Sequence, residues 1–236
     1  MYKAFGIVSS SGRNIYVDGM QDYRPIGAFS FLGRYRVIDF PISNMTNSNI
    51  ERIQVYINNK PRSVVEHLGT GRHYNINSKS GRLHILYSDF ANAEWSVYNN
   101  DLAAYEENME CIEAVKYPYV VIAPSYMIYT QNYDELLKTH IESGADITLL
   151  YHSVDNAKEY YLNCSTLNLN KQKGVLSLEP NHGNAKNRNI FMDTYVMRKD
   201  LFMELVKKGR KISSMFTLND IVNMACSELD LSLIHL

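Results

Sequence analysis

Short apolar runs separated by helix-like segments limit the fold of this chain more than any other feature. The run Tyr119 to Ala123 (YVVIA) is almost continuously apolar, and Lys3 to Val8 and Ile147 to Tyr151 resemble it. Such runs are typical of strands buried on both faces of a parallel sheet. Because they alternate with segments of helical spacing, the sequence predicts an α/β fold with a mostly parallel, mixed sheet and helices on both faces.

The remaining elements are predicted from periodicity and from turn residues. A long loop is expected over 9–33. The alternation LDLSLI near the end of the sequence predicts a final strand. Further strands are expected at 52–57, 83–87, 162–169, 175–178 and 190–197, with 162–169 and 175–178 as an antiparallel pair. Helices are expected at 34–47, 61–68, 100–115, 133–142, 199–208 and 218–227.

Charge and cysteine content exclude several classes of protein. The 236 residues include 24 Lys and Arg against 25 Asp and Glu, a net charge of −1, so nothing favours a nucleic acid or an anionic membrane as partner. Three widely spaced cysteines form no CxxC pair, and the histidines show no metal-ligand spacing. With no apolar stretch of 18 residues, these features predict a cytoplasmic protein without a metal site.

The loop after the first strand is where α/β folds often bind phosphates. It follows neither the GxGxxG nor the Walker A pattern, so a weak anion site and a plain connecting loop both stay open. Its residues are Ser9, Ser10, Ser11, Gly12, Arg13 and Asn14.

The most distinctive segment is GRYRVIDFPISN at 33–44, a cationic turn that leads into an amphipathic helix. It resembles the G-[KR]-Y-R-[LIV]-I-D-F-P-[LI]-S-N segment of the glucose-1-phosphate adenylyltransferases, which make ADP-glucose. The stretches NSNIERIQVYINN, RSVVEHLGTGRHYNI and YPYVVIAPSYMIY resemble the segments that follow in that family. The resemblance covers nearly the whole chain, and it implies a Rossmann-like nucleotidyltransferase domain of the GT-A-like type.

The chain departs from this family at the positions that carry its chemistry. The family's first loop reads G-G-x-G-T-R-L, whereas here one glycine remains and Asn14 takes the arginine position. The Mg²⁺-binding aspartate of its G-D-H-I-Y turn aligns with Tyr126, and the sugar-phosphate lysine of its E-K-P motif aligns with Glu179. A phenol with a pKa of roughly 10 is a poor Mg²⁺ ligand beside a carboxylate. The loss of that carboxylate is expected to raise the barrier to adenylyl transfer by several kcal/mol.

With these departures, the sequence resembles the regulatory, GlgD-type branch of the family. This resemblance implies that the present chain has no catalytic residues. The resemblance then implies a catalytic glucose-1-phosphate adenylyltransferase subunit as hetero-oligomeric partner and a sugar-phosphate or nucleotide effector. No tightly bound cofactor is expected, with Mg²⁺ and ATP needed only for residual activity. Two alternatives stay open: an active nucleotidyltransferase that uses substitute residues, and a non-catalytic sensor of nucleotides or sugar phosphates.

The resemblance also suggests a domain boundary and two further candidate residues. Residues 1–236 are expected to form the nucleotidyltransferase-like domain, cut before its last strands and without the family's C-terminal β-helix domain. Arg24 is a candidate anion contact, the alternative being a solvated loop charge. Trp95, the only tryptophan, aligns with a family loop that relays effector binding, although a packing role is the simpler interpretation.

Overall fold

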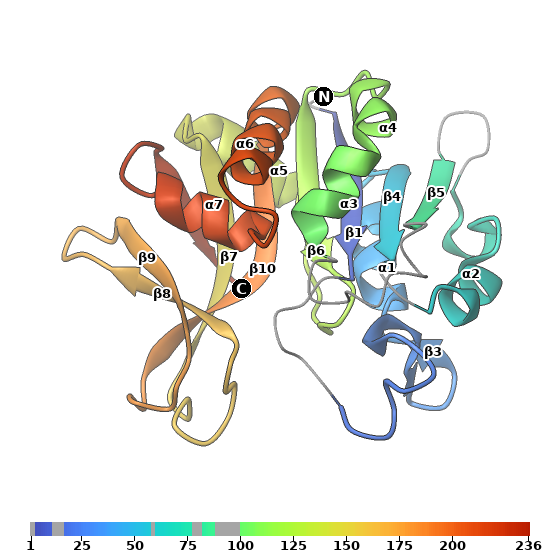
Figure 1. Ribbon diagram of the computed structural model, residues 1–236, viewed down its shortest axis with the longest axis horizontal. Coiled ribbons are helices and arrows are strands. Elements are labelled where there is room, and N and C mark those ends of the chain that lie inside the picture. Colours follow the sequence, from blue (N-terminus) through green and yellow to red (C-terminus); the bar gives the residue numbers. More distant parts are fainter. Residues whose placement is uncertain (1–2, 11–16, 58–59, 77–81, 88–99) are drawn as a thin grey trace.

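The computed structural model describes residues 3–10, 17–57, 60–76, 82–87 and 100–236. Within them, nine strands form one mixed sheet in the order β11-β7-β10-β6-β1-β4-β5, with β8 and β9 as a branch (Figure 1). The strands are β1 (Ala4–Ser9), β4 (Arg52–Ile57), β5 (Arg82–Tyr87), β6 (Tyr119–Pro124), β7 (Ile147–Val154), β8 (Ser165–Leu169), β9 (Val175–Pro180), β10 (Arg188–Arg198) and β11 (Leu231–His235). The predicted α/β class is confirmed.

Strand β10 divides the sheet. On one side of it, β6, β1, β4 and β5 are parallel, and β1 is the central strand between β4 and β6. β10 runs antiparallel to both β6 and β7, and its pairing with β7 shifts register between Phe191 and Tyr195. The predicted antiparallel pair β8–β9 and the final strand, which pairs in parallel with β7, are both present.

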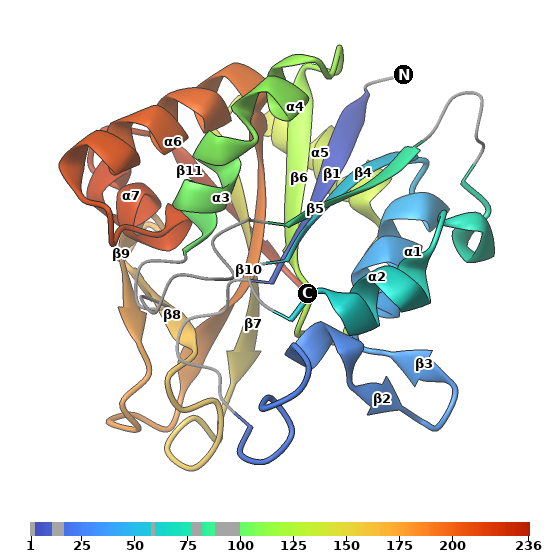
Figure 2. The same cartoon turned by 45° about the vertical axis from the view of Figure 1, so that its right-hand side comes forward.

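Helices cover both faces of the sheet (Figure 2), and a hydrophobic core lies on each face. One contains α3 (Asp101–Glu107), α4 (Met109–Glu113), α6 (Lys199–Ile212) and α7 (Leu218–Ala225), with Phe5 and Ile122 from the sheet. The other contains α1 (Asp39–Asn47), α2 (Arg62–Leu68) and α5 (Tyr133–Ser143), with Val8 and Val121. Neighbouring residues of each central strand enter opposite cores, which explains why these strands are continuously apolar.

The helix predicted over 34–47 begins later than expected. Residues Ser30–Phe31 (β2) and Tyr35–Arg36 (β3) form a small antiparallel hairpin, and α1 starts at Asp39. Pro41 therefore lies in the first turn, where its missing N–H leaves no helical hydrogen bond unmade. The predicted long loop over 9–33 also contains, in its described part, a 3₁₀ turn at Ile26–Ala28 and β2.

The helix predicted over 100–115 is two helices, α3 and α4, that meet at Asn108. The backbone of Asn108 leaves the helical region (φ −106°, ψ 23°), and its side-chain Nδ2 donates to the carbonyl of Ala104 at 3.0 Å. Asparagine side chains compete in this way with the helical hydrogen bonds. Periodicity alone does not detect such a break, because apolar residues continue with helical spacing on both sides.

Asp39 explains why the segment 33–44 has a fixed structure. Its Oδ1 accepts hydrogen bonds from the Tyr74 hydroxyl and from His67 Nε2, the latter at 2.6 Å, and its Oδ2 accepts from the backbone N–H of Arg36 at 2.8 Å. Arg36 in turn donates to the carbonyl of Ser63 at the start of α2. One carboxylate therefore joins the hairpin, α1, α2 and the turn at Tyr74.

No helix in the described part of the chain is both long enough and apolar enough to cross a membrane.

Candidate functional site

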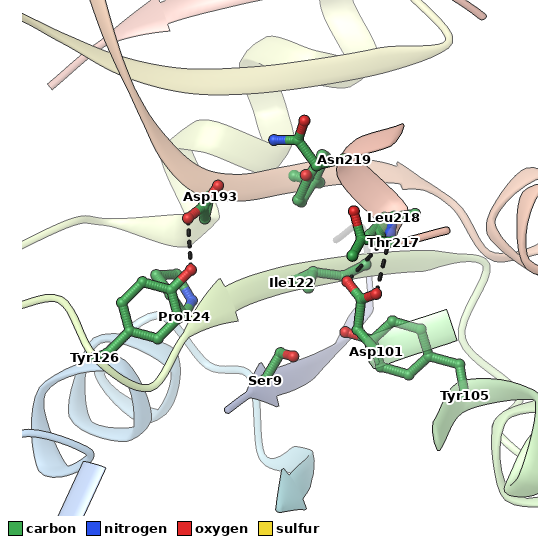
Figure 3. Close-up of a pocket in the computed structure, with 11 residues that line it drawn as sticks. Ser9, Asp101, Tyr105, Ile122, Pro124, Tyr126, Asp193, Thr217, Leu218 and Asn219 are labelled. Carbon is green, nitrogen blue, oxygen red and sulfur yellow. Dashed lines mark hydrogen bonds between the residues drawn. The ribbon is translucent and has the colours of Figure 1, made fainter. Parts of the chain in front are cut away.

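A small pocket lies where the parallel strands β1 and β6 end, on the face covered by α3 and α7 (Figure 3). This edge of an open α/β sheet is where ligands usually bind. The cavity has a volume of about 30 Å³, room for one or two water molecules. It is lined by Ser9, Asp101, Tyr105, Ile122, Pro124, Tyr126, Asp193, Tyr195, Thr217, Leu218 and Asn219.

The serine loop is anchored to its neighbours before it leaves the sheet. The Ser9 carbonyl accepts from the backbone N–H of Ser125 at 2.8 Å, and the Ser10 N–H donates to the carbonyl of Tyr56 at 3.1 Å. The hydroxyl of Ser125 also reaches that of Ser10 at 3.3 Å. The first two residues of the candidate phosphate loop therefore use their backbone groups in contacts with strand β4 and with the turn after β6.

Tyr126 follows β6, and its side chain points across the pocket to β10. Its hydroxyl donates a hydrogen bond to Oδ2 of Asp193, shown as a dashed line in Figure 3. Asp193 lies within the register shift of β10 and has a positive φ of 45°, which is uncommon for a residue other than glycine. Burial and the Asp193 carboxylate raise the pKa of Tyr126 well above its ordinary value, so this side chain is a neutral hydrogen-bond donor.

Asp101 provides the second carboxylate of the pocket. It is the first residue of α3, and its oxygens lie 3.1 and 3.2 Å from the backbone nitrogen of Leu218, the first residue of α7 (Figure 3). Thr217 caps the same helix in a capping box with Asp220. A carboxylate at a helix N-terminus interacts favourably with the helix dipole and with the unpaired N–H groups there.

The described lining of this pocket is acidic. It contains two aspartates and no lysine or arginine, whereas phosphoryl and nucleotidyl transfer depends on cations that neutralise phosphate charge. The described residues also contain no group of three or more His, Cys, Asp or Glu side chains placed to hold a metal ion. As described, this pocket resembles a hydrogen-bonded polar cluster more than a phosphate site.

The other candidate residues do not meet in this pocket. Arg24 is exposed ahead of the 3₁₀ turn and forms no hydrogen bond or ion pair with described residues. Glu179 is exposed on β9. The Ser177 hydroxyl donates a hydrogen bond to its carboxylate at 2.9 Å, and this bond is the largest cause of the lowered pKa of Glu179. Trp95 and the loop residues Ser11, Gly12, Arg13 and Asn14 lie outside the described residues.

Sequence reasoning missed Asp193 and gave Asp101 no role. Asp193 had a detectable signal, since it is the single acidic residue within the apolar stretch 190–197 that predicts a buried strand. A charge at such a position is found where it is paired or has a function. The contact of Asp101 with α7 bridges 117 positions of sequence, and no local pattern reveals it.

Buried tyrosines around the site predict a sharp alkaline limit to stability. Burial raises the pKa of Tyr129 to about 12, and it raises the pKa of Tyr105, Tyr126 and Tyr133 well above the ordinary value of 10. A raised pKa in the folded state means that its stabilising effect is complete below pH 10 and is lost as the pH rises further. We expect unfolding by urea to need less denaturant above pH 10 and phenolate absorbance to appear together with unfolding. Ionisation of these tyrosines well before unfolding would contradict this prediction.

Comparison with known proteins identifies the family. A family model described as "Nucleotidyl transferase" matches residues 23–232. The chain belongs to the nucleotidyl transferase family. It is 30% identical over 165 residues to "Glycogen biosynthesis protein GlgD" of Geobacillus stearothermophilus, which covers 70% of this chain and 48% of that protein. It is 27% identical over 186 residues to "Glucose-1-phosphate adenylyltransferase" of Clostridioides difficile (strain 630), which covers 78% of this chain and 47% of that protein. The resemblance predicted from the sequence is confirmed.

A solved structure shows the same nucleotidyl transferase fold. It comes from Bacillus anthracis, is described as a glucose-1-phosphate thymidylyltransferase in complex with sucrose, and matches with a TM-score of 0.76. The match covers 99% of this chain and 87% of that one at 15% sequence identity, so it supports the fold alone. This chain spans about half the length of the curated relatives that it matches.

Proposed function

We propose that this nucleotidyl transferase domain belongs to a regulatory, catalytically reduced subunit of glucose-1-phosphate adenylyltransferase in the synthesis of ADP-glucose for glycogen. The contact of Tyr126 with Asp193 carries the proposal. In the resemblance stated above, position 126 is that of the metal-binding aspartate, and here a neutral phenol donates a hydrogen bond across the pocket. A phenol whose pKa is raised further by burial is a weaker metal ligand than an exposed one.

Three further observations support reduced catalysis. The described lining of the pocket offers two carboxylates and no cation for a phosphate group. The cavity has a volume of about 30 Å³, whereas small-molecule sites usually measure roughly 300–1,000 Å³. The position of the sugar-phosphate lysine is occupied by Glu179, an exposed acid. These observations favour a subunit that acts through a catalytic partner, and ATP and Mg²⁺ would then be bound weakly or not at all.

The names of the relatives support the pathway. One relative is called a glycogen biosynthesis protein and others are called glucose-1-phosphate adenylyltransferases. A hetero-oligomer with a catalytic subunit, an anionic effector and a place in the cytoplasm are parts of the same proposal.

Turnover in the presence and absence of a catalytic subunit tests the proposal. The full-length protein is purified alone, and pyrophosphate release is measured with ATP, Mg²⁺ and glucose 1-phosphate. We expect release at background level for the protein alone, and a changed kcat or effector response when it is added to a catalytic adenylyltransferase subunit from the same organism. Robust turnover by the protein alone, or an unchanged catalytic subunit over all mixing ratios, would contradict the proposal.

A further inference from the structure

A second cavity lies at the opposite end of the strands from the pocket of Tyr126. It has a volume of about 380 Å³ and is formed where β1, β4 and β5 begin, beside α4 and the residues that lead into β6. Figure 2 shows α4 near the amino ends of β1 and β6. The cavity is lined by Phe5, Arg52, Ile53, Gln54, Arg82, His84, Glu110, Cys111, Ala114 and Val115.

Two arginines lie side by side at the mouth of this groove. Arg52 of β4 and Arg82 of β5 are register partners on neighbouring parallel strands, and both are exposed. Neither guanidinium forms an ion pair with a carboxylate of the described residues; Arg52 instead lies 5.8 Å from the centroid of the Tyr117 ring, and Lys3 Nζ lies 5.7 Å from the same ring. Like charges directly opposite each other on neighbouring strands are unfavourable, and no ion pair with a described carboxylate offsets this repulsion.

The interior of the groove holds polar groups in fixed positions. Gln54 is buried, its Nε2 donates to the carbonyl of Cys111 at 2.9 Å, and its Oε1 accepts from the Tyr56 hydroxyl at 2.9 Å. His84 is the register partner of Gln54, and its pKa is lowered by burial and by the charge of Arg82. Glu110, an exposed residue on α4, adds one carboxylate at the rim of the groove.

We propose that this groove binds a small phosphate ester that carries hydroxyl groups. Two guanidinium groups on adjacent strands match the charge of a phosphate and can bond its oxygens through paired N–H groups. Glu110 is exposed, and its carboxylate can accept a hydrogen bond from a hydroxyl group of the ligand, a donor that bare phosphate at neutral pH supplies poorly. A volume of about 380 Å³ falls in the usual range for small-molecule sites, roughly 300–1,000 Å³. Because the groove lies at the far end of the strands, this inference does not depend on the proposed function.

Binding is tested by calorimetry at constant ionic strength with glycerol phosphate, inorganic phosphate and sodium chloride as probes. We expect saturable binding of glycerol phosphate, weaker binding of inorganic phosphate and none of chloride. Arg82→Gln and Arg52→Gln are each expected to weaken glycerol phosphate binding about tenfold. The matched control is Arg62→Gln, since Arg62 is an exposed arginine on α2 outside the groove, and it is expected to bind as the parent does.

Alkylation of Cys111 gives a second measurement that is specific to the groove. All three cysteines are free and partly buried, and only Cys111 lines this cavity. The rate of alkylation at each cysteine is measured by peptide mass spectrometry. We expect glycerol phosphate to slow alkylation at Cys111, while the rates at Cys164 and Cys226 stay unchanged. Absence of saturable binding, equal binding of chloride, or equal losses in Arg82→Gln and Arg62→Gln would overturn the proposal.

Discussion

The variant Tyr126→Asp, combined with Ser9→Gly and Ser10→Gly, is expected to gain Mg²⁺-dependent pyrophosphate release at least about tenfold above the unmodified full-length protein. The substitution replaces a phenol with a carboxylate in a pocket that Asp193 and Asp101 also line. Three carboxylates that line one small pocket repel one another, and a divalent cation bound between them would relieve that repulsion. Metal affinity and activity are therefore expected to rise together.

Thermal unfolding with and without Mg²⁺ separates metal binding from catalysis. The Tyr126→Asp protein is expected to be less stable than its parent in chelator, and to regain about 2.7 kcal/mol when free Mg²⁺ is 100 times its dissociation constant. The matched control is Tyr126→Asn, which removes the phenol without adding charge and is expected to show no response to Mg²⁺. If the aspartate variant responds no more than the asparagine variant, a carboxylate at position 126 is not enough to create a Mg²⁺ site.

Asp39→Asn is expected to lower the free energy of unfolding by about 2–3 kcal/mol. The carboxylate is 13% exposed and accepts from three donors on different segments, the Tyr74 hydroxyl, His67 Nε2 and the Arg36 N–H. An asparagine keeps one acceptor oxygen, and its amide group faces at least one of these donors with a donor of its own. Hydrogen bonds to a charged acceptor are about twice as strong as neutral ones.

Urea unfolding followed by circular dichroism measures this loss. Asp155→Asn makes the same chemical change at an exposed turn after β7, where a surface substitution is expected to alter stability by no more than about 0.5 kcal/mol. Equal effects of the two substitutions would show that the Asp39 contacts contribute little to stability.

The layered fold could be predicted from the sequence because its signals are local. Continuous apolar runs such as Tyr119–Ala123 mark strands covered on both faces, and α5 is bounded by the cap Asn132 and by Gly144 at a positive φ. The break at Asn108 and the hairpin before α1 were missed for one reason. Each depends on a hydrogen bond between a side chain and the backbone, that of Asn108 with Ala104 and that of Asp39 with Arg36. The spacing of the apolar residues hardly changes at either place.

The candidate site was less predictable because its contacts join distant segments. Position 126 could be singled out from the resemblance, but its partner Asp193 lies 67 residues further along the chain. Asp101 similarly meets Leu218 only after α3 and α7 pack together on one face of the sheet. What Glu179 and the serine loop imply for the binding of sugar phosphates and nucleotides remains a prediction.

The irregularity in β10 has a consequence for how this protein can change by mutation. Asp193 has a positive φ, a conformation that aspartate adopts more readily than most residues other than glycine, and its carboxylate accepts a hydrogen bond from Tyr126. Substitutions at the two positions are therefore epistatic: the cost of losing one side chain depends on which residue occupies the other. The effect of a paired substitution at positions 126 and 193 is therefore expected to differ from the sum of the two single effects.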